Sequence, residues 1–160
     1  MEISAEEKID LVSRLMTEGE FEQSFIVTLA IYKKYSNPLV LFNVAALLVD
    51  IGQMGKNKEA SRLALKIMND NENIFLSMEE IDKNIFYYNF GNAKSNFIED
   101  RKDLDISNNL SFDDIEDLIE LKTYYWKAIN FSKKKHKKIP PKYIVNFGNS
   151  LKRQFRLVEA

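Results

Sequence analysis

Carboxamide side chains in a recurring motif are the feature of this 160-residue chain that most suggests a binding chemistry. The motif is an aromatic or apolar residue, then Asn, an apolar residue and Gly or Ala, and it is centred on Asn43, Asn89 and Asn146. It is most complete over residues 87–93 and returns, shortened, over 145–150. A carboxamide donates and accepts hydrogen bonds at the same time, so it can pair with the backbone of an extended peptide.

Residues suited to catalysis or metal binding are scarce. The chain has no Cys, which excludes disulfides, thiolate metal sites and cysteine nucleophiles, and its single His, His136, lies in a basic run. Acidic residues after Ser111 could hold a cation, but carboxylates in the first turn of a helix are explained by the helix dipole. We therefore predict a protein without enzymatic activity, cofactor or metal. The acidic residues are Asp113, Asp114, Glu116 and Asp117.

Charge is divided unevenly along the chain, although the net charge is −1. Residues 1–120 hold 12 Lys and Arg against 23 Asp and Glu, whereas residues 121–160 hold 11 against one. Such a division can steer a partner or let two copies attract each other. The run Lys133 to Lys138 could contact phosphate, but it lacks the interleaved aromatic or Arg residues that hold bases. A solvated helix end explains this run better than a nucleic-acid site, and His136 is expected at the surface.

Composition favours helices. Apolar residues make up 45% of the chain, while only three Pro and five Gly provide turn signals, so long helices are favoured over many short strands. The N-terminus lacks the pattern of a signal peptide, and no apolar run has the roughly 18 residues of a membrane span. A cytoplasmic, helical protein is the expectation.

Capping and breaking residues predict where these helices begin and end. Ser4 and Ser77 each open a capping box with Glu three positions later. The predicted helices cover roughly 4–19, 20–35, 39–50, 58–68, 77–98, the segment from Ser111 to about 138, and 142 onward. The connections include a turn at 52–57, a stop at 69–71 and a loop at 99–111.

The motif also predicts how the helices pack. Its small residue would admit a neighbouring antiparallel helix, and its apolar residues would fill the space around the contact. Aromatic residues at and near the motif are expected in the core. These residues are Tyr87, Tyr88, Tyr124, Tyr125 and Trp126.

These residues resemble tetratricopeptide repeats. Residues 87–93 look like the first helix of a repeat, and 123–129 resemble the second, with Tyr125 and Ala128 at its aromatic and small positions. In the preceding unit Gly52 falls at the family's turn glycine. Once the longer connections are subtracted, the motif spacing approaches the family's period of about 34 residues. The resemblance implies an all-α fold of seven or eight helices, stacked as a short right-handed α-solenoid in one domain over 1–160.

The last of the implied repeats is unfinished. The units span roughly 4–37, 39–71, 78–138 with the loop at 99–111, and 142–160, where residues 156–160 match only a turn and the start of a second helix. A helix with an apolar face and no neighbour cannot bury that face. We therefore expect an N-terminal fragment, a truncated reading frame, or a protein that borrows a helix from a partner or from another copy.

Relatives of this kind usually bind peptides in a concave groove lined by the first helices. A carboxylate clamp is not expected here, because Ile9, Tyr88 and Val145 occupy the positions where such a clamp has Lys. The alternative for the Asn residues is that they bridge neighbouring repeats. The resemblance places in the groove Asn43, Asn89, Asn92, Asn146, Asn149 and Tyr88, with positive charge from Lys152 and Arg153.

Three functions follow from the resemblance. The leading hypothesis is a non-catalytic module that binds a protein or peptide partner. A second is the regulatory front of a longer enzyme, because the Asn-containing units are similar to those that precede HEPN ribonuclease domains in bacterial proteins. The nuclease motif itself is missing, since His136 has no Arg shortly before it. A third is a small secretion chaperone built from three such repeats.

Overall fold

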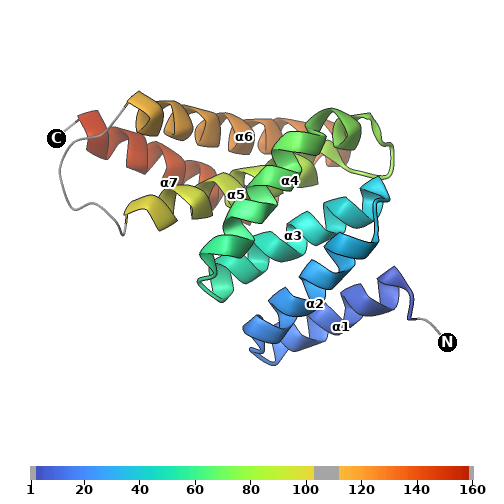
Figure 1. Ribbon diagram of the computed structural model, residues 1–160. Helices are drawn as coiled ribbons and strands as arrows, with labels where there is room; N and C mark the ends of the chain where they lie inside the picture. The colour runs from blue at the N-terminus through green and yellow to red at the C-terminus, as the bar shows by residue number, and fades with distance from the viewer. Residues whose placement is uncertain (1–2, 103–111, 159–160) are drawn as a thin grey trace. The chain divides into compact units, whose positions relative to one another are not determined.

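The computed structural model describes residues 3–102 and 112–158 (Figure 1). This part of the chain holds seven α-helices and no strand, which confirms the all-α prediction. None of the helices described is both long and apolar enough to cross a membrane. The helices are α1 (Ala5–Thr17), α2 (Phe21–Lys34), α3 (Pro38–Met54), α4 (Lys58–Ser77), α5 (Lys83–Lys102), α6 (Phe112–His136) and α7 (Pro141–Val158).

Backbone contacts divide the chain into two compact units, Met1–Glu80 and Ile81–Ala160. In the first unit α3 packs extensively on α4, and α2 packs on both α1 and α3. In the second unit α6 packs on both α5 and α7. Helices that follow one another in sequence are therefore neighbours in space within each unit, as short connections dictate. The assignment of one repeat domain to residues 1–160 stays a prediction.

The capping box at the start of α1 is present as predicted. The Ser4 hydroxyl accepts a hydrogen bond from the Glu7 N–H at 3.2 Å, and the Glu7 carboxylate accepts one from the Ser4 N–H at 2.8 Å. These two contacts satisfy N–H groups that a helix start leaves without intrahelical partners. The chain then turns after α1 at Gly19, whose φ of +79° suits a residue without a side chain.

Helix α3 is longer than predicted, and Gly52 is not in a turn. The helix begins at Pro38, where the Asn37 side chain caps the first free N–H groups, and it continues to Met54. Gly52 lies buried within it, so close to α4 that a Cβ there would come within 2.3 Å of the Ser61 hydroxyl. Gly52 therefore allows α3 and α4 to pack closely, and it does not form the turn that links them.

Helix α4 also passes its predicted end. Residues 69–71 do not stop it, because the Asn71 side chain donates to the Ile67 carbonyl within the helix at 2.9 Å. Four residues later Phe75 is fully buried and packs edge-on against Phe42 of α3, with ring centroids 5.5 Å apart. Burial of this ring outweighs the local turn signals. The predicted cap at Ser77 is also wrong: this residue ends α4 and donates its hydroxyl to the Ile74 carbonyl.

Three boundaries in the second unit differ from the prediction. Helix α5 begins at Lys83, and residues 99–102, predicted as loop, belong to it. Helix α7 is continuous to Val158, so residues 156–158 form no turn. Its first residue is Pro141, a position where the missing N–H costs nothing. The rest of the predicted loop, residues 103–111 with Ser111, lies outside the described residues.

Candidate functional site

Gly91 sets the contact between α5 and α6. A Cβ at Gly91 would lie 2.7 Å from Cε1 of Tyr125, whose side chain is buried. The motif therefore admits a neighbouring helix as predicted, although it admits the ring of Tyr125 and not a bare backbone. Beside this contact the ring of Phe90 stacks on Tyr124 with centroids 4.2 Å apart, and Tyr87 stacks on Phe131 at 5.7 Å.

The side-chain amide of Asn92, next to the Tyr125 hydroxyl, connects all three helices of the second unit. The Asn92 side-chain carbonyl accepts a hydrogen bond from the Tyr125 hydroxyl at 2.9 Å and another from the Asn146 amide at 3.0 Å. The Asn146 amide also donates to the Tyr88 hydroxyl at 3.2 Å. We call these four residues, Tyr88, Asn92, Tyr125 and Asn146, the amide seam. It fixes the register of α7 against α5, because each hydrogen bond requires a particular pair of positions.

Cationic side chains flank the amide seam. The Arg153 guanidinium donates to the Ser95 hydroxyl at 3.0 Å, and the Lys142 ammonium lies 4.9 Å from the centre of the Tyr88 ring. Both contacts join a residue of α7 to a residue of α5. An anionic or amide-bearing ligand on this surface would meet positive charge on both sides of neutral hydrogen-bonding groups.

Lys94, whose side chain is only 12% exposed, forms ion pairs on another side of α5. The Lys94 ammonium lies 2.6 Å from Asp117 and 2.9 Å from Glu120, both on α6. Burial by itself would lower the pKa of Lys94, but the hydrogen bonds and charges of these two carboxylates outweigh it, and the pKa is raised. Lys94 is thus held as a cation against α6 and contributes to the packing of the two helices.

The structure brings together several of the predicted site residues and separates others. Tyr88, Asn92, Asn146 and Arg153 meet along the contact of α5 with α7. Asn89 is half-buried on α5, whereas Asn149 and Lys152 are exposed on α7. Asn43 is half-buried on α3, in the first unit. Asn92 and Asn146 thus bridge two helices, which is the alternative that the sequence left open, and contact with a peptide stays a prediction.

Sequence reasoning missed the roles of Tyr125 and Ser95 and misplaced Trp126. Tyr125 was expected as core packing, yet its hydroxyl also orients Asn92. Nothing in the motif points to Ser95, because its partner Arg153 is far away in sequence. Trp126 is 51% exposed, so the prediction of a core position is wrong. Tyr124 and Tyr125 pack on α5, and the next residue, Trp126, is turned a further angle of about 100° around the helix and lies outside that contact.

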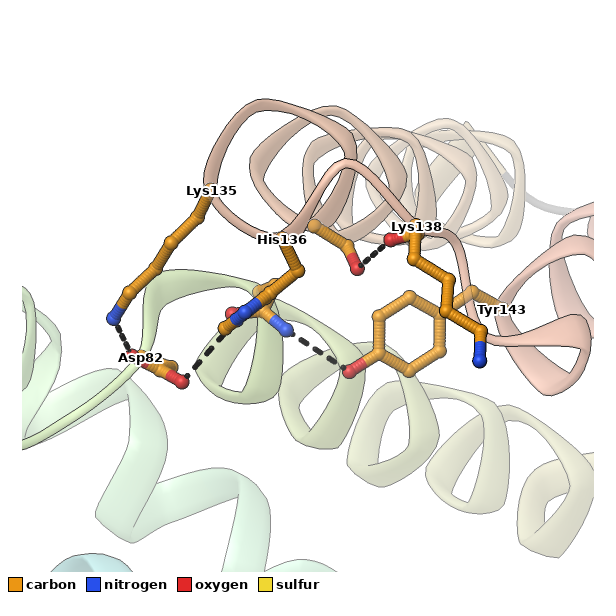
Figure 2. A network of polar contacts seen from close by, with 7 residues as sticks. Asp82, Lys135, His136, Lys138 and Tyr143 are labelled. Atoms are coloured by element: carbon orange, nitrogen blue, oxygen red, sulfur yellow. Dashed lines mark hydrogen bonds and ion pairs between the residues drawn. The ribbon is translucent and has the colours of Figure 1, made fainter.

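A second polar cluster joins the end of α6 to the start of α5 (Figure 2). Lys135 forms an ion pair with the Asp82 carboxylate, and His136 Nε2 lies 3.5 Å from its other oxygen. The hydrogen bond from Lys135 is the main reason that the pKa of Asp82 is lowered, although burial opposes it. Two residues of the basic run, Lys135 and His136, therefore close a helix contact, and the positive charge of Lys135 suits the C-terminal end of a helix.

The interior of this cluster is neutral. The Asn84 amide donates to the Tyr143 hydroxyl at 3.4 Å, while the Asn84 carbonyl oxygen is buried and has no hydrogen-bond partner. Burial raises the pKa of Tyr143 despite this hydrogen bond. The Ser132 hydroxyl donates to the Lys138 carbonyl at 2.7 Å and closes the turn after α6. Within the described ranges, 3–102 and 112–158, no three His, Cys, Asp or Glu side chains are grouped to hold a metal ion.

Comparisons of the chain with protein-family models, with curated proteins and with solved structures gave no match.

The two motif glycines provide a matched pair for testing the close contact. We expect Gly91→Ala to lower the free energy of unfolding by about 1–3 kcal/mol, because Tyr125 is held by Asn92 and cannot yield to a new methyl group. Gly148→Ala should raise it by about 0.5–1 kcal/mol, since a Cβ there meets nothing within 4 Å and Ala favours a helix. Urea unfolding followed by the fluorescence of Trp126 measures both. Equal effects at the two glycines would contradict the packing described.

Asp82 should make stability depend on pH. Its pKa is lowered in the folded state, so its contribution is complete above the unfolded pKa and is lost as the pH falls through the folded pKa. Asp82→Asn should lower the free energy of unfolding by about 0.5 kcal/mol at neutral pH, the range of an exposed ion pair, and the variant and wild type should converge in strong acid. Urea titrations at both pH values test this. Glu116→Gln, the same change at an exposed position on α6, is the control.

Proposed function

We propose that the chain is a non-catalytic interaction module of the tetratricopeptide-repeat kind, which binds a peptide along the amide seam. The observation that carries this proposal is the hydrogen bond between Asn146 and Asn92, with Tyr88 beside it. Asn146 occupies on α7 the motif position that Asn89 occupies on α5. The hydrogen bond joins Asn146 to Asn92, three residues beyond Asn89, so the two helices that bear one motif lie side by side with an offset of three residues. Neighbouring helices that carry the same motif are expected of stacked repeats.

The chemistry of this surface suits an extended, acidic peptide. The half-buried Tyr88 and Asn92 carry hydroxyl and amide groups, which can pair with peptide N–H and C=O groups. Lys142 and Arg153 flank them, and Asn149 and Lys152 extend the surface along the exposed side of α7. A peptide carrying Asp or Glu beside its paired backbone would satisfy both kinds of group.

Affinity selection tests this function directly. The purified chain is used to select from a displayed library of random 12-residue peptides, and the selected peptides are measured by fluorescence polarisation. We expect enrichment of Asp and Glu. Asn149→Ala combined with Lys152→Ala should weaken binding at least tenfold, which corresponds to about 1.4 kcal/mol. Both residues are exposed, so the fold is preserved.

The control combines Asn69→Ala with Lys33→Ala, two exposed residues of the first unit. This variant should bind the selected peptides as the wild type does. Failure to select any peptide, or equal binding by both double variants, would refute the proposed function.

A further inference from the structure

One face of α5 is covered by α6. It is formed by Tyr87, Phe90, Gly91 and Lys94, which recur at helical spacing. Phe90 is fully buried, Tyr87 is 6% exposed, and only 12% of the Lys94 side chain is exposed. The rings of Tyr124 and Tyr125 pack on this face. Helix α6 thus packs over the Asn-Phe-Gly-Asn motif of α5.

Among the residues that the structure describes, none forms such a cover over the same motif on α7. Aligning Asn146 with Asn89 places Ile144, Phe147, Gly148 and Leu151 at the equivalent positions. Ile144 is 53% exposed, against 6% for Tyr87. A Cβ at Gly148 would meet nothing within 4 Å, whereas one at Gly91 would strike Tyr125. Within the described residues, the two copies of the pattern therefore differ in whether a helix packs above the glycine.

Exposed apolar side chains of α6 extend this open face. Ile115, Ile119 and Trp126 lie along one side of α6 at spacings of four and seven residues and are 44%, 50% and 51% exposed. The ring of Trp126 lies 5.8 Å from that of Phe147, which connects the two helices. We call these three residues together with Ile144, Phe147, Gly148 and Leu151 the α6–α7 face. Large apolar side chains gathered on adjoining helices mark an interaction surface.

Lysines outnumber acidic residues around this face, although the exposed Glu116 lies beside Ile115. Lys122 lies between Ile119 and Trp126 on the same side of α6, and Lys133 lies two helical turns beyond Trp126. Lys152 lies one turn from Gly148 on α7. Helix α7 carries four basic residues and no acidic one over 141–158. The equivalent face of α5 is covered by the acidic half of α6, where Asp117 and Glu120 hold Lys94.

We propose that the α6–α7 face binds an acidic amphipathic α-helix of a partner protein. The apolar side of the partner's helix, with a large residue above Gly148, would displace water from Ile144, Trp126 and Leu151. Its carboxylates would meet the lysines at the margin, as those of α6 meet Lys94. Apart from Lys152, which borders both surfaces, this face shares no residue with the peptide surface of the proposed function, so Gly148→Glu tests it separately.

A second copy of the chain suits this face poorly. A two-fold contact would place the face against itself and bring Lys122 and Lys152 near the same residues of the other copy. Like charges at such a contact are unfavourable. Nor can α6 of another copy supply the cover, because its aromatic side, with Tyr125, is buried on its own α5.

Trp126 is the only tryptophan in the chain and lies within the proposed site, so its emission reports on binding. The probe is an 18-residue helical peptide with Leu and Phe on one side and Glu on the other, and the control peptide has Lys at every Glu position. We expect the Glu peptide to shift the emission of Trp126 to shorter wavelength, with saturation and a micromolar Kd. The Lys peptide should bind at least tenfold more weakly.

Gly148→Glu tests the location without disturbing the fold, because a side chain there enters open space. This variant should weaken binding of the Glu peptide at least tenfold. Ile26→Glu, at a 60% exposed position of the first unit, should have no effect. The proposal is overturned by absence of a shift, by equal binding of both peptides, by equal binding of Gly148→Glu, or by a shift that follows the concentration of the chain alone, which would indicate self-association.

Discussion

The second unit depends on one close contact, that between Gly91 on α5 and the ring of Tyr125 on α6. Because no Cβ stands at residue 91, the ring reaches the helix axis closely enough for its hydroxyl to find Asn92. That hydrogen bond orients the Asn92 carbonyl, which then receives the amide of Asn146 from α7. The absence of a side chain at Gly91 thus helps to position α7, because it lets Tyr125 orient the Asn92 amide that binds Asn146.

The two ends of this arrangement are held by charge. Lys94 sits between two carboxylates of α6, and Asp82 at the start of α5 receives Lys135 and His136 from the end of α6. The acidic first half and basic last turn of α6 are therefore both used to align it with α5. The uneven charge of the sequence acts within this unit, and the cations that remain on α7 give its exposed surface a positive character.

The helical class, the capping box at Ser4 and the packing role of the motif glycine could all be predicted from local patterns. The ends of α4 and α7 could not, because turn-forming residues such as Asn71 are satisfied inside a helix when a distant ring, here Phe75, gains by burial. Gly52 shows the same limit: a glycine signals either a turn or a close approach, and only the partner Ser61 decides which. In the candidate site the repeated motif predicts that Asn side chains bridge neighbouring helices, but it does not give the pair of Asn92 with Asn146, because the equivalent of Asn146 is Asn89. The pair of Ser95 with Arg153 likewise depends on a three-dimensional register that no local pattern encodes.

The central claim is that Asn92 of α5 and Asn146 of α7 pair across the amide seam and so fix the position of α7 along α5. A double-mutant cycle with Asn92→Ala, Asn146→Ala and both together measures this contact most directly, through urea unfolding of the four proteins. The account predicts a coupling of about 1 kcal/mol, as for a partly buried hydrogen bond. Effects that add to within about 0.3 kcal/mol would show that the two side chains do not interact, and the seam, with the peptide site built on it, would be contradicted.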